Sequence, residues 1–255
     1  MNKKPPKASG KHFMIDQALI TRICDAGFLE RNDVVLEVGA GSGNLTYELC
    51  KRCKFVYAVE KDRLLCEKLR TRLDNSCIIN CEIINADALK IEYPKFNKVI
   101  SNIPYAISRK FIIKLLSYNF ELCTLVVQME FAQKLMSCAG SKNYRLVSAL
   151  TGSFCDVEIL EAINRSAFDP MPEVESALIR ITPLSFQMKK SEYNDYVKFL
   201  RNLFSQKNKL ITNVLDKILN YKTKKNKISD KFTNLRVYEL SPVEFIEIFN
   251  KIKDH

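Results

Sequence analysis

Residues 99–105 read V-I-S-N-I-P-Y and place an amide, a rigid ring and an aromatic ring at the end of an apolar run. The Asn102 amide offers an oxygen that accepts hydrogen bonds, and Tyr105 offers a flat face. Pro104 removes one main-chain N–H and favours an extended conformation for the residue before it. This combination suits a planar molecule whose donor hydrogens need acceptors.

An exocyclic amine of a nucleic-acid base is such a group. Its lone pair is delocalised into the ring, so the nitrogen is a weak nucleophile. Acceptors from Asn102 and from a main-chain carbonyl beside Pro104 would bind both amine hydrogens and turn the lone pair toward a methyl donor, while Tyr105 stacks on the base. We therefore predict methyl transfer to a base amine at Asn102, Pro104 and Tyr105.

A glycine-rich turn upstream predicts the donor. In E-V-G-A-G-S-G, Gly39 and Gly41 follow an apolar strand, and Glu60 ends the next strand, where an acid can accept from ribose hydroxyls. A dinucleotide would favour G-x-G-x-x-G, whereas this spacing, preceded by Glu37, suits a ligand without phosphate. S-adenosylmethionine is such a ligand. Asp87, with Ala88 beside it in N-A-D-A-L, can accept from the adenine amine.

A base has to leave its RNA or DNA stack to enter such a pocket. Phe168 lies in a loop stiffened by Pro170 and Pro172, and we expect it to stack on the second face of the base. The alternative is an aromatic that only packs in the loop or the core.

Apolar strands alternate with helices along most of the chain, which predicts an α/β fold with a mostly parallel sheet covered on both faces. We expect strands at 34–38, 55–59, 81–85, 98–101, 122–128, 156–160 and 176–181, the last pair forming an antiparallel edge. Helices are expected at 15–26, from the glycine turn to about 50, and at 61–73, 108–118, 130–137, 143–152, 191–204, 207–220 and 241–253.

The net charge of +11 lies at the two ends of the chain, because residues 12–183 carry equal numbers of acidic and basic side chains. This distribution predicts a flexible basic tail over 1–11, a catalytic domain over 12–183 and a small, basic, all-α domain over 184–255 that binds RNA. Phosphate contacts are expected from Lys207, Lys209, Lys222, Lys224 and Lys225.

The composition is that of an ordinary globular protein, and the sequence has neither a membrane-spanning apolar run nor a signal peptide. We expect a cytoplasmic monomer without a membrane partner, or a nucleolar one in a eukaryote. Nine cysteines without a secretory signal indicate reduced thiols. Cys50 and Cys53, with Cys77 and Cys81, are a weak candidate for zinc, and we expect no metal.

Five segments, taken in order, resemble the ribosomal RNA adenine dimethyltransferase family: E-V-G-A-G-S-G-N-L-T, E-K-D, N-A-D-A-L, S-N-I-P-Y-A-I-S and F-D-P-M-P-E-V-E-S-A-L-I-R-I. The resemblance implies the Rossmann-like, seven-stranded fold of class I S-adenosylmethionine-dependent methyltransferases. L-F-S-Q-K-N-K-L-I-T-N-V-L favours the branch that modifies small-subunit rRNA, especially its archaeal and eukaryotic-type members.

By matching position, the resemblance implies cofactor contacts from His12, Met14, Gly39, Glu60, Asp87 and Asn102. It also implies that Asn102, Tyr105 and Phe168 hold the target adenine. The expected reaction is dimethylation of two adjacent adenines near the 3′ end of small-subunit rRNA, within an assembling ribosomal subunit. Lys11, Glu173 and Asn208 depart from the family pattern, and we expect these departures to affect substrate binding more than catalysis.

Three alternatives stay open. A macrolide-resistance enzyme that methylates large-subunit rRNA has similar motifs. An RNA-binding assembly factor could keep the fold without using its catalysis, although the intact Asn102 and Tyr105 argue against it. A nicotinamide-dependent oxidoreductase would leave N-I-P-Y unexplained.

Overall fold

The computed structural model describes residues 12–185, 188–219 and 230–253. The expected tail over 1–11 and the candidate contacts Lys222, Lys224 and Lys225 lie outside the described residues. Within the described ranges, no helix has the length and apolar character needed to cross a membrane.

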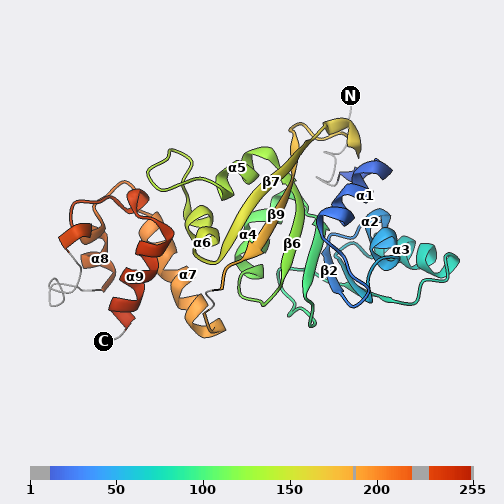
Figure 1. Cartoon of the computed structure of the whole chain (residues 1–255), viewed down its shortest axis with the longest axis horizontal. Coiled ribbons are helices and arrows are strands. Elements are labelled where there is room, and N and C mark those ends of the chain that lie inside the picture. Colours follow the sequence, from blue (N-terminus) through green and yellow to red (C-terminus); the bar gives the residue numbers. More distant parts are fainter. Residues whose placement is uncertain (1–11, 186–187, 220–229, 254–255) are drawn as a thin grey trace, which may run out of the picture. The chain divides into compact units, whose positions relative to one another are not determined.

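A seven-stranded sheet forms the centre of the region that is expected to be catalytic (Figure 1). Its spatial order is β4-β3-β2-β5-β6-β9-β7. The strands are β2 (Val34–Val38), β3 (Phe55–Glu60), β4 (Cys81–Asn85), β5 (Lys98–Asn102), β6 (Leu122–Gln128), β7 (Cys155–Ile163) and β9 (Ser176–Pro183). The pairs formed among β2 to β6 are parallel, and β9 runs antiparallel to β6. The prediction of a mostly parallel seven-stranded sheet is confirmed.

The helices associated with this sheet are α1 (Gln17–Ala26), α2 (Asn44–Cys50), α3 (Arg63–Asn75), α4 (Ser108–Leu115) and α5 (Met129–Leu135). Side-chain caps set two of their starts: Asp16 accepts from Leu19 N, and Asp62 accepts from Leu64 N. Leucine, isoleucine and valine side chains from α1 to α3 and the central strands form one buried core. This core holds the carboxyl ends of β2, β3 and β5 in place.

A short two-stranded sheet was not expected from the sequence. It pairs β1 (Phe13–Met14) with β8 (Phe168–Asp169) in antiparallel register, Met14 opposite Phe168. Two-residue strands carry too little periodicity to be recognised from sequence. The pair joins the first described residues to the loop before β9.

Two compact units can be separated within the chain. One contains the described residues up to Lys114, Asn119–Ala132 and Glu158–Pro183, and the other contains Leu115–Tyr118, Gln133–Val157 and the described residues from Leu184 onward. The sequence predicts a domain boundary directly after Pro183. The second unit also includes Leu115–Tyr118 and Gln133–Val157, which precede that boundary in the chain.

The second unit is helical, with α6 (Leu146–Phe154), α7 (Lys190–Phe204), α8 (Ile211–Leu219) and α9 (Pro242–Lys253). Aromatic rings join these helices: Tyr196 lies 5.8 Å from Phe154 and 5.1 Å from Phe249, centroid to centroid. Helix α8 begins at Ile211 rather than at 207, because residues before it form turns and Leu210 bridges to Arg236.

Candidate active site

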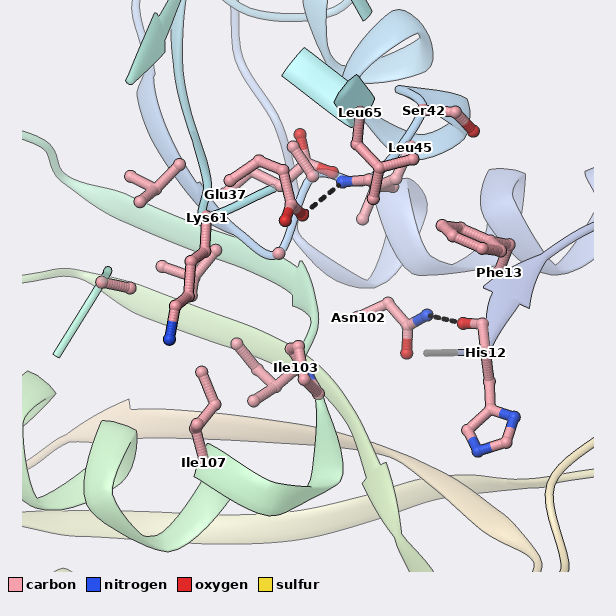
Figure 2. Close-up of a pocket in the computed structure, with 18 of the residues that line it drawn as sticks. His12, Phe13, Glu37, Ser42, Leu45, Lys61, Leu65, Asn102, Ile103 and Ile107 are labelled. Atoms are coloured by element: carbon pink, nitrogen blue, oxygen red, sulfur yellow. Dashed lines mark hydrogen bonds between the residues drawn. The ribbon is translucent and has the colours of Figure 1, made fainter. Parts of the chain in front are cut away.

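A cavity of about 290 Å³ opens where β2, β3 and β5 end (Figure 2). This is close to the lower limit of the volume typical of small-molecule sites. Ten residues predicted from the sequence line it together: His12, Met14, Gly39, Gly41, Glu60, Asp87, Ala88, Asn102, Pro104 and Tyr105. They come from segments far apart in the chain, and the parallel sheet brings them to one edge.

The glycine turn passes close to the N-I-P-Y segment. Gly39 has φ +80°, and a Cβ atom there would lie 2.8 Å from Cδ of Pro104. Gly41 has φ +59°, and its Cβ would lie 3.3 Å from the Phe13 ring. Both positions favour glycine by backbone conformation, and Gly39 also by space. The turn thus leaves its main chain exposed to a ligand.

Two carboxylates face the cavity with part of their acceptor capacity in use. Glu60 Oε2 accepts from Gly41 N at 3.0 Å, and Oε1 accepts from Asp62 N at 2.8 Å. Asp87 Oδ1 accepts from Leu89 N at 3.0 Å, and Oδ2 lies 3.6 Å from Lys61 Nζ. The Leu89 N–H, and then the Lys61 ammonium, lower the pKa of Asp87. The backbone bonds fix both side chains while lone pairs remain for a ligand.

Asn102 is oriented by the main chain of His12. Its Nδ2 donates to the His12 carbonyl oxygen at 3.3 Å, as Figure 2 shows. A carbonyl oxygen only accepts, so the amide nitrogen has to face it and Oδ1 has to face the other way. No described residue donates to Oδ1, which leaves an acceptor at the cavity wall.

Tyr105 is held by its hydroxyl, which lies 2.5 Å from the Oγ atom of Ser176. Burial raises the pKa of Tyr105, so the phenol stays neutral. The His12 ring lies 5.6 Å from the Tyr105 ring at an interplanar angle of 30°, and His12 Nδ1 is 2.7 Å from the carbonyl oxygen of Pro170. Tyr105 therefore presents a fixed aromatic surface beside Asn102.

Phe168 is not among the residues that line the cavity. Its side chain is 3% exposed and belongs to the buried core, opposite Met14 in the short sheet. The structure thus places its segment near the site but covers its ring. Stacking of a base on Phe168 stays a prediction, and it requires the ring to become uncovered.

The sequence reasoning missed Asn44 as a structural part of the site. Its Nδ2 donates to the carbonyl oxygen of Met14 at 2.7 Å, and its Oδ1 accepts from Arg72 at 2.5 Å. Asn44 thereby ties β1 to the start of α2. Its position directly after Gly43 of the glycine turn is the feature of the sequence that indicates a role for Asn44 at the site. Phe13, Glu37 and Lys61 also line the cavity without having been predicted to do so.

The cysteines form no metal centre in the described part of the chain. All nine are free thiols, with Cys50 and Cys53 buried and Cys77 exposed. No three histidine, cysteine, aspartate or glutamate side chains gather as a ligand set within the described ranges.

A cationic cluster lies in the helical unit. We define it as Lys142, Arg145, Lys207, Lys209 and Arg236. Lys207 Nζ lies 3.5 Å from the Lys142 carbonyl oxygen, and Arg145 donates to the same oxygen at 2.6 Å. Burial, and then the charge of Arg145, lower the pKa of Lys207. No described carboxylate forms an ion pair with these five side chains.

Comparison with known proteins decides the family. Residues 2–254 match the sequence profile described as "Ribosomal RNA adenine dimethylase". The chain belongs to this family. It is thus an S-adenosylmethionine-dependent methyltransferase acting on rRNA, and the predicted class I methyltransferase fold is confirmed.

A probable ribosomal RNA small subunit methyltransferase A from Methanosarcina acetivorans is 39% identical over 250 residues, covering 96% of this chain and 92% of the relative. Among solved structures, a dimethyladenosine transferase from Plasmodium falciparum has a TM-score of 0.81 and 26% identity, covering 95% of this chain and 98% of that chain. The 23S rRNA methyltransferase ErmE has a TM-score of 0.68 and 26% identity, covering 94% and 99%.

The family's cofactor fits the cavity. Its main-chain turn, its two carboxylates and the free Asn102 oxygen supply the acceptors and close approach that S-adenosylmethionine requires. Buried Glu37 adds an oxygen without a hydrogen-bond partner among the described residues. These acceptor oxygens are therefore suited to a cationic ligand that carries amine and hydroxyl groups as hydrogen-bond donors.

Proposed function

We propose that this protein dimethylates two adjacent adenines near the 3′ end of small-subunit rRNA. The observation that carries the proposal is the Asn102 amide, whose Oδ1 faces away from the His12 carbonyl oxygen at the wall of a cavity that Tyr105 also lines. Support for the small-subunit branch comes from the relatives named as small subunit methyltransferases and from the greater structural similarity to the dimethyladenosine transferase than to ErmE.

In this proposal, Glu60 binds the ribose hydroxyls of the cofactor, and Asp87 with Ala88 binds its adenine. His12, Met14, Gly39 and Gly41 form the rest of the cofactor site. When bound, S-adenosylmethionine supplies an activated methyl group. The protein is left to position the acceptor and to exclude water.

Asn102 Oδ1 and a main-chain carbonyl beside Pro104 accept the two hydrogens of the adenine amine. This arrangement would direct the nitrogen lone pair toward the methyl group. As the N–C bond forms, the S–C bond of the donor would break to leave the uncharged thioether, and the amine proton would pass to solvent. Tyr105 holds the base flat from one side. Phe168 is the candidate for the other side if RNA binding uncovers its ring.

The helical unit supplies the RNA contacts in this proposal. Lys207 and Lys209 were predicted to bind phosphate. Lys207 and Arg145 share the Lys142 carbonyl oxygen, and Arg236 donates to the carbonyl oxygen of Asn208, which lies between the two lysines in the chain. Five cations without described acidic partners suit the phosphate backbone of rRNA. We propose that the enzyme acts as a monomer on an assembling small subunit in the cytoplasm.

The experiment that tests this function measures methyl incorporation from labelled S-adenosylmethionine into two substrates. Immature small subunits should be labelled at two adjacent adenines, and naked large-subunit RNA should not. Labelling of the large-subunit RNA alone would establish the ErmE-like alternative. Cofactor binding without labelling of either would favour an assembly factor.

A further inference from the structure

Glu37 is a buried acid that the fold does not explain. It lies in β2, two residues before Gly39, and lines the cavity (Figure 2). Its side chain is 2% exposed, and Oε2 has no hydrogen-bond partner among the described residues. Both oxygens of Glu60, by contrast, accept main-chain N–H groups. A buried carboxyl group that has an unpartnered oxygen, and whose one neighbouring donor is the Thr46 hydroxyl, is costly to ionise, so Glu37 requires another account.

No cation balances this side chain from the elements packed against it in the described structure. Thr46 and Cys50 of α2, Cys24 of α1 and Glu60 of β3 are its polar and titratable neighbours. Burial raises the pKa of Glu37, a hydrogen bond from the Thr46 hydroxyl opposes part of this effect, and the charge of Glu60 adds to it, so that the pKa lies at about 8. Lys61, also at the cavity, lies 3.6 Å from Asp87.

We propose that Glu37 is a positioning residue for the positive charge of the cofactor, holding a proton in the free cavity and releasing it to solvent when S-adenosylmethionine binds. The proton leaves the carboxyl group, the carboxylate stays, and no bond to the ligand forms or breaks. The inference rests on the proposed cofactor role of this cavity. It does not depend on which RNA is methylated.

The proposal fixes the sign of a pH effect. Below about pH 8 the free cavity carries the proton, so a cationic ligand has to displace it. Affinity should then rise by up to about tenfold per pH unit between pH 6 and 7 and less steeply toward pH 8, near which the α-amino group of the ligand, with an ordinary pKa of about 7.7–8.0, begins to lose its own proton. A neutral side chain in place of Glu37 should remove this dependence.

Calorimetry with the full chain tests the proposal directly. S-adenosylmethionine is titrated at pH 7 in buffers of different ionisation enthalpy, and the number of protons released follows from the slope. The wild type should release about one proton per ligand bound. Glu37→Gln should release almost none, whereas Glu60→Gln, the matched control in the same cavity, should bind more weakly but still release its proton.

S-adenosylhomocysteine, whose sulfur is uncharged, separates the two positive groups of the cofactor. Less proton release with it assigns the effect to the sulfonium, and equal release assigns it to the ammonium; either result supports the proposal. Binding by the wild type without proton release, or equal release by Glu37→Gln, overturns it. Absence of any binding would instead contradict the cofactor role of the cavity and, with it, both proposals.

A second measurement covers the case in which Glu37→Gln fails to fold. In the wild type, isotope-edited infrared spectra should show a protonated glutamic acid carbonyl band at pH 7 that disappears when S-adenosylmethionine is added. A band that is absent from the free protein, or unchanged by the ligand, contradicts the proposal.

Discussion

The amide nitrogen of Asn102 donates to the main-chain carbonyl of His12, 3.3 Å away and 90 residues earlier in the chain. The end of β5 is therefore oriented by a segment at the start of the described structure. His12 in turn lies beside the Tyr105 ring and the Pro170 carbonyl. The position of one acceptor oxygen thus depends on three segments that only the folded chain brings together.

Replacing Asn102 by Ala should lower the rate of methyl transfer by about 10²- to 10³-fold, because one acceptor that orients the amine is lost. Single-turnover kinetics with immature small subunits measure this, and calorimetry measures the cofactor affinity, which should fall much less. Asn75→Ala, at an exposed asparagine ending α3, is the control. Full activity of Asn102→Ala would sink the proposed mechanism.

Two substitutions of Tyr105 distinguish the contribution of its ring from that of its hydroxyl group. Tyr105→Phe removes the bond to Ser176, at 2.5 Å, but keeps the aromatic face, so activity should fall by less than about tenfold. Tyr105→Ala removes the stacking surface, worth about 1–3 kcal/mol per base, and should raise KM for RNA by about 5- to 150-fold. Equal effects of the two substitutions would show that the hydroxyl, not the ring, matters.

The site could largely be predicted from sequence because its residues follow strands. Gly39, Glu60, Asp87 and Asn102 each lie at or just after the end of a strand of the parallel part of the sheet, and parallel strands end at one edge. The Asn102–His12 and Asn44–Met14 bonds could not be predicted, because they join segments without a shared periodic pattern.

Phe168 illustrates a second reason why part of the site could not be predicted from the sequence. Its motif indicates a role at the site, but the extent to which its ring is covered depends on the short pairing of β1 with β8. Helix α8 shows the same limit on the fold. Its apolar pattern predicts a helix, but its start at Ile211 is set by a bridge from Leu210 to Arg236. Long-range pairing decides both outcomes.

Gly39→Ala should weaken S-adenosylmethionine binding, because the new Cβ would lie 2.8 Å from Pro104 and the backbone has φ +80°. Gly140→Ala is a matched control, since Gly140 has φ +81° but no atom within 4 Å of the added Cβ. Both should lose about 1–2 kcal/mol of stability from backbone strain. Calorimetry should show at least tenfold weaker cofactor binding for Gly39→Ala alone, and unchanged binding would contradict the close approach.

The Lys98–Asp33 ion pair should be important for stability. The two side chains are 8% and 6% exposed, with Nζ 2.9 Å from Oδ2. Burial raises the pKa of Asp33, but hydrogen bonds from Lys98, Glu30 N and Asn97 outweigh it and lower the pKa overall. Lys98→Met should cost about 3–5 kcal/mol, because it leaves a buried carboxylate without its cation.

Urea unfolding measures this cost, and Arg63→Ala in the exposed Arg63–Glu67 pair is the control, at about 0.5 kcal/mol or less. The contribution of Asp33 is present above its unfolded pKa, near 3.9. It should be lost as the pH falls from there through the lower folded value. A loss for Lys98→Met no larger than that for Arg63→Ala would contradict the role of the pair.

The cationic cluster should determine RNA affinity independently of the cofactor site. Arg145 and Lys207 lie close enough for the charge of Arg145 to lower the pKa of Lys207, and no described carboxylate compensates either. Such a pair is unfavourable in the free protein and gains when a phosphate approaches both. Replacing both by Ala should therefore weaken RNA binding and reduce the slope of log affinity against log salt by about 1–2.

Lys251→Ala is the control from the same helical unit, because Lys251 already pairs with Glu247 at 2.9 Å. It should leave both the affinity and the salt slope almost unchanged. Filter binding to small-subunit rRNA over a range of salt concentrations gives both quantities, while S-adenosylmethionine affinity should stay constant in every variant. An unaltered slope in the Arg145 and Lys207 double variant would mean that phosphate contacts lie elsewhere, since counterion release follows the number of neutralised phosphates.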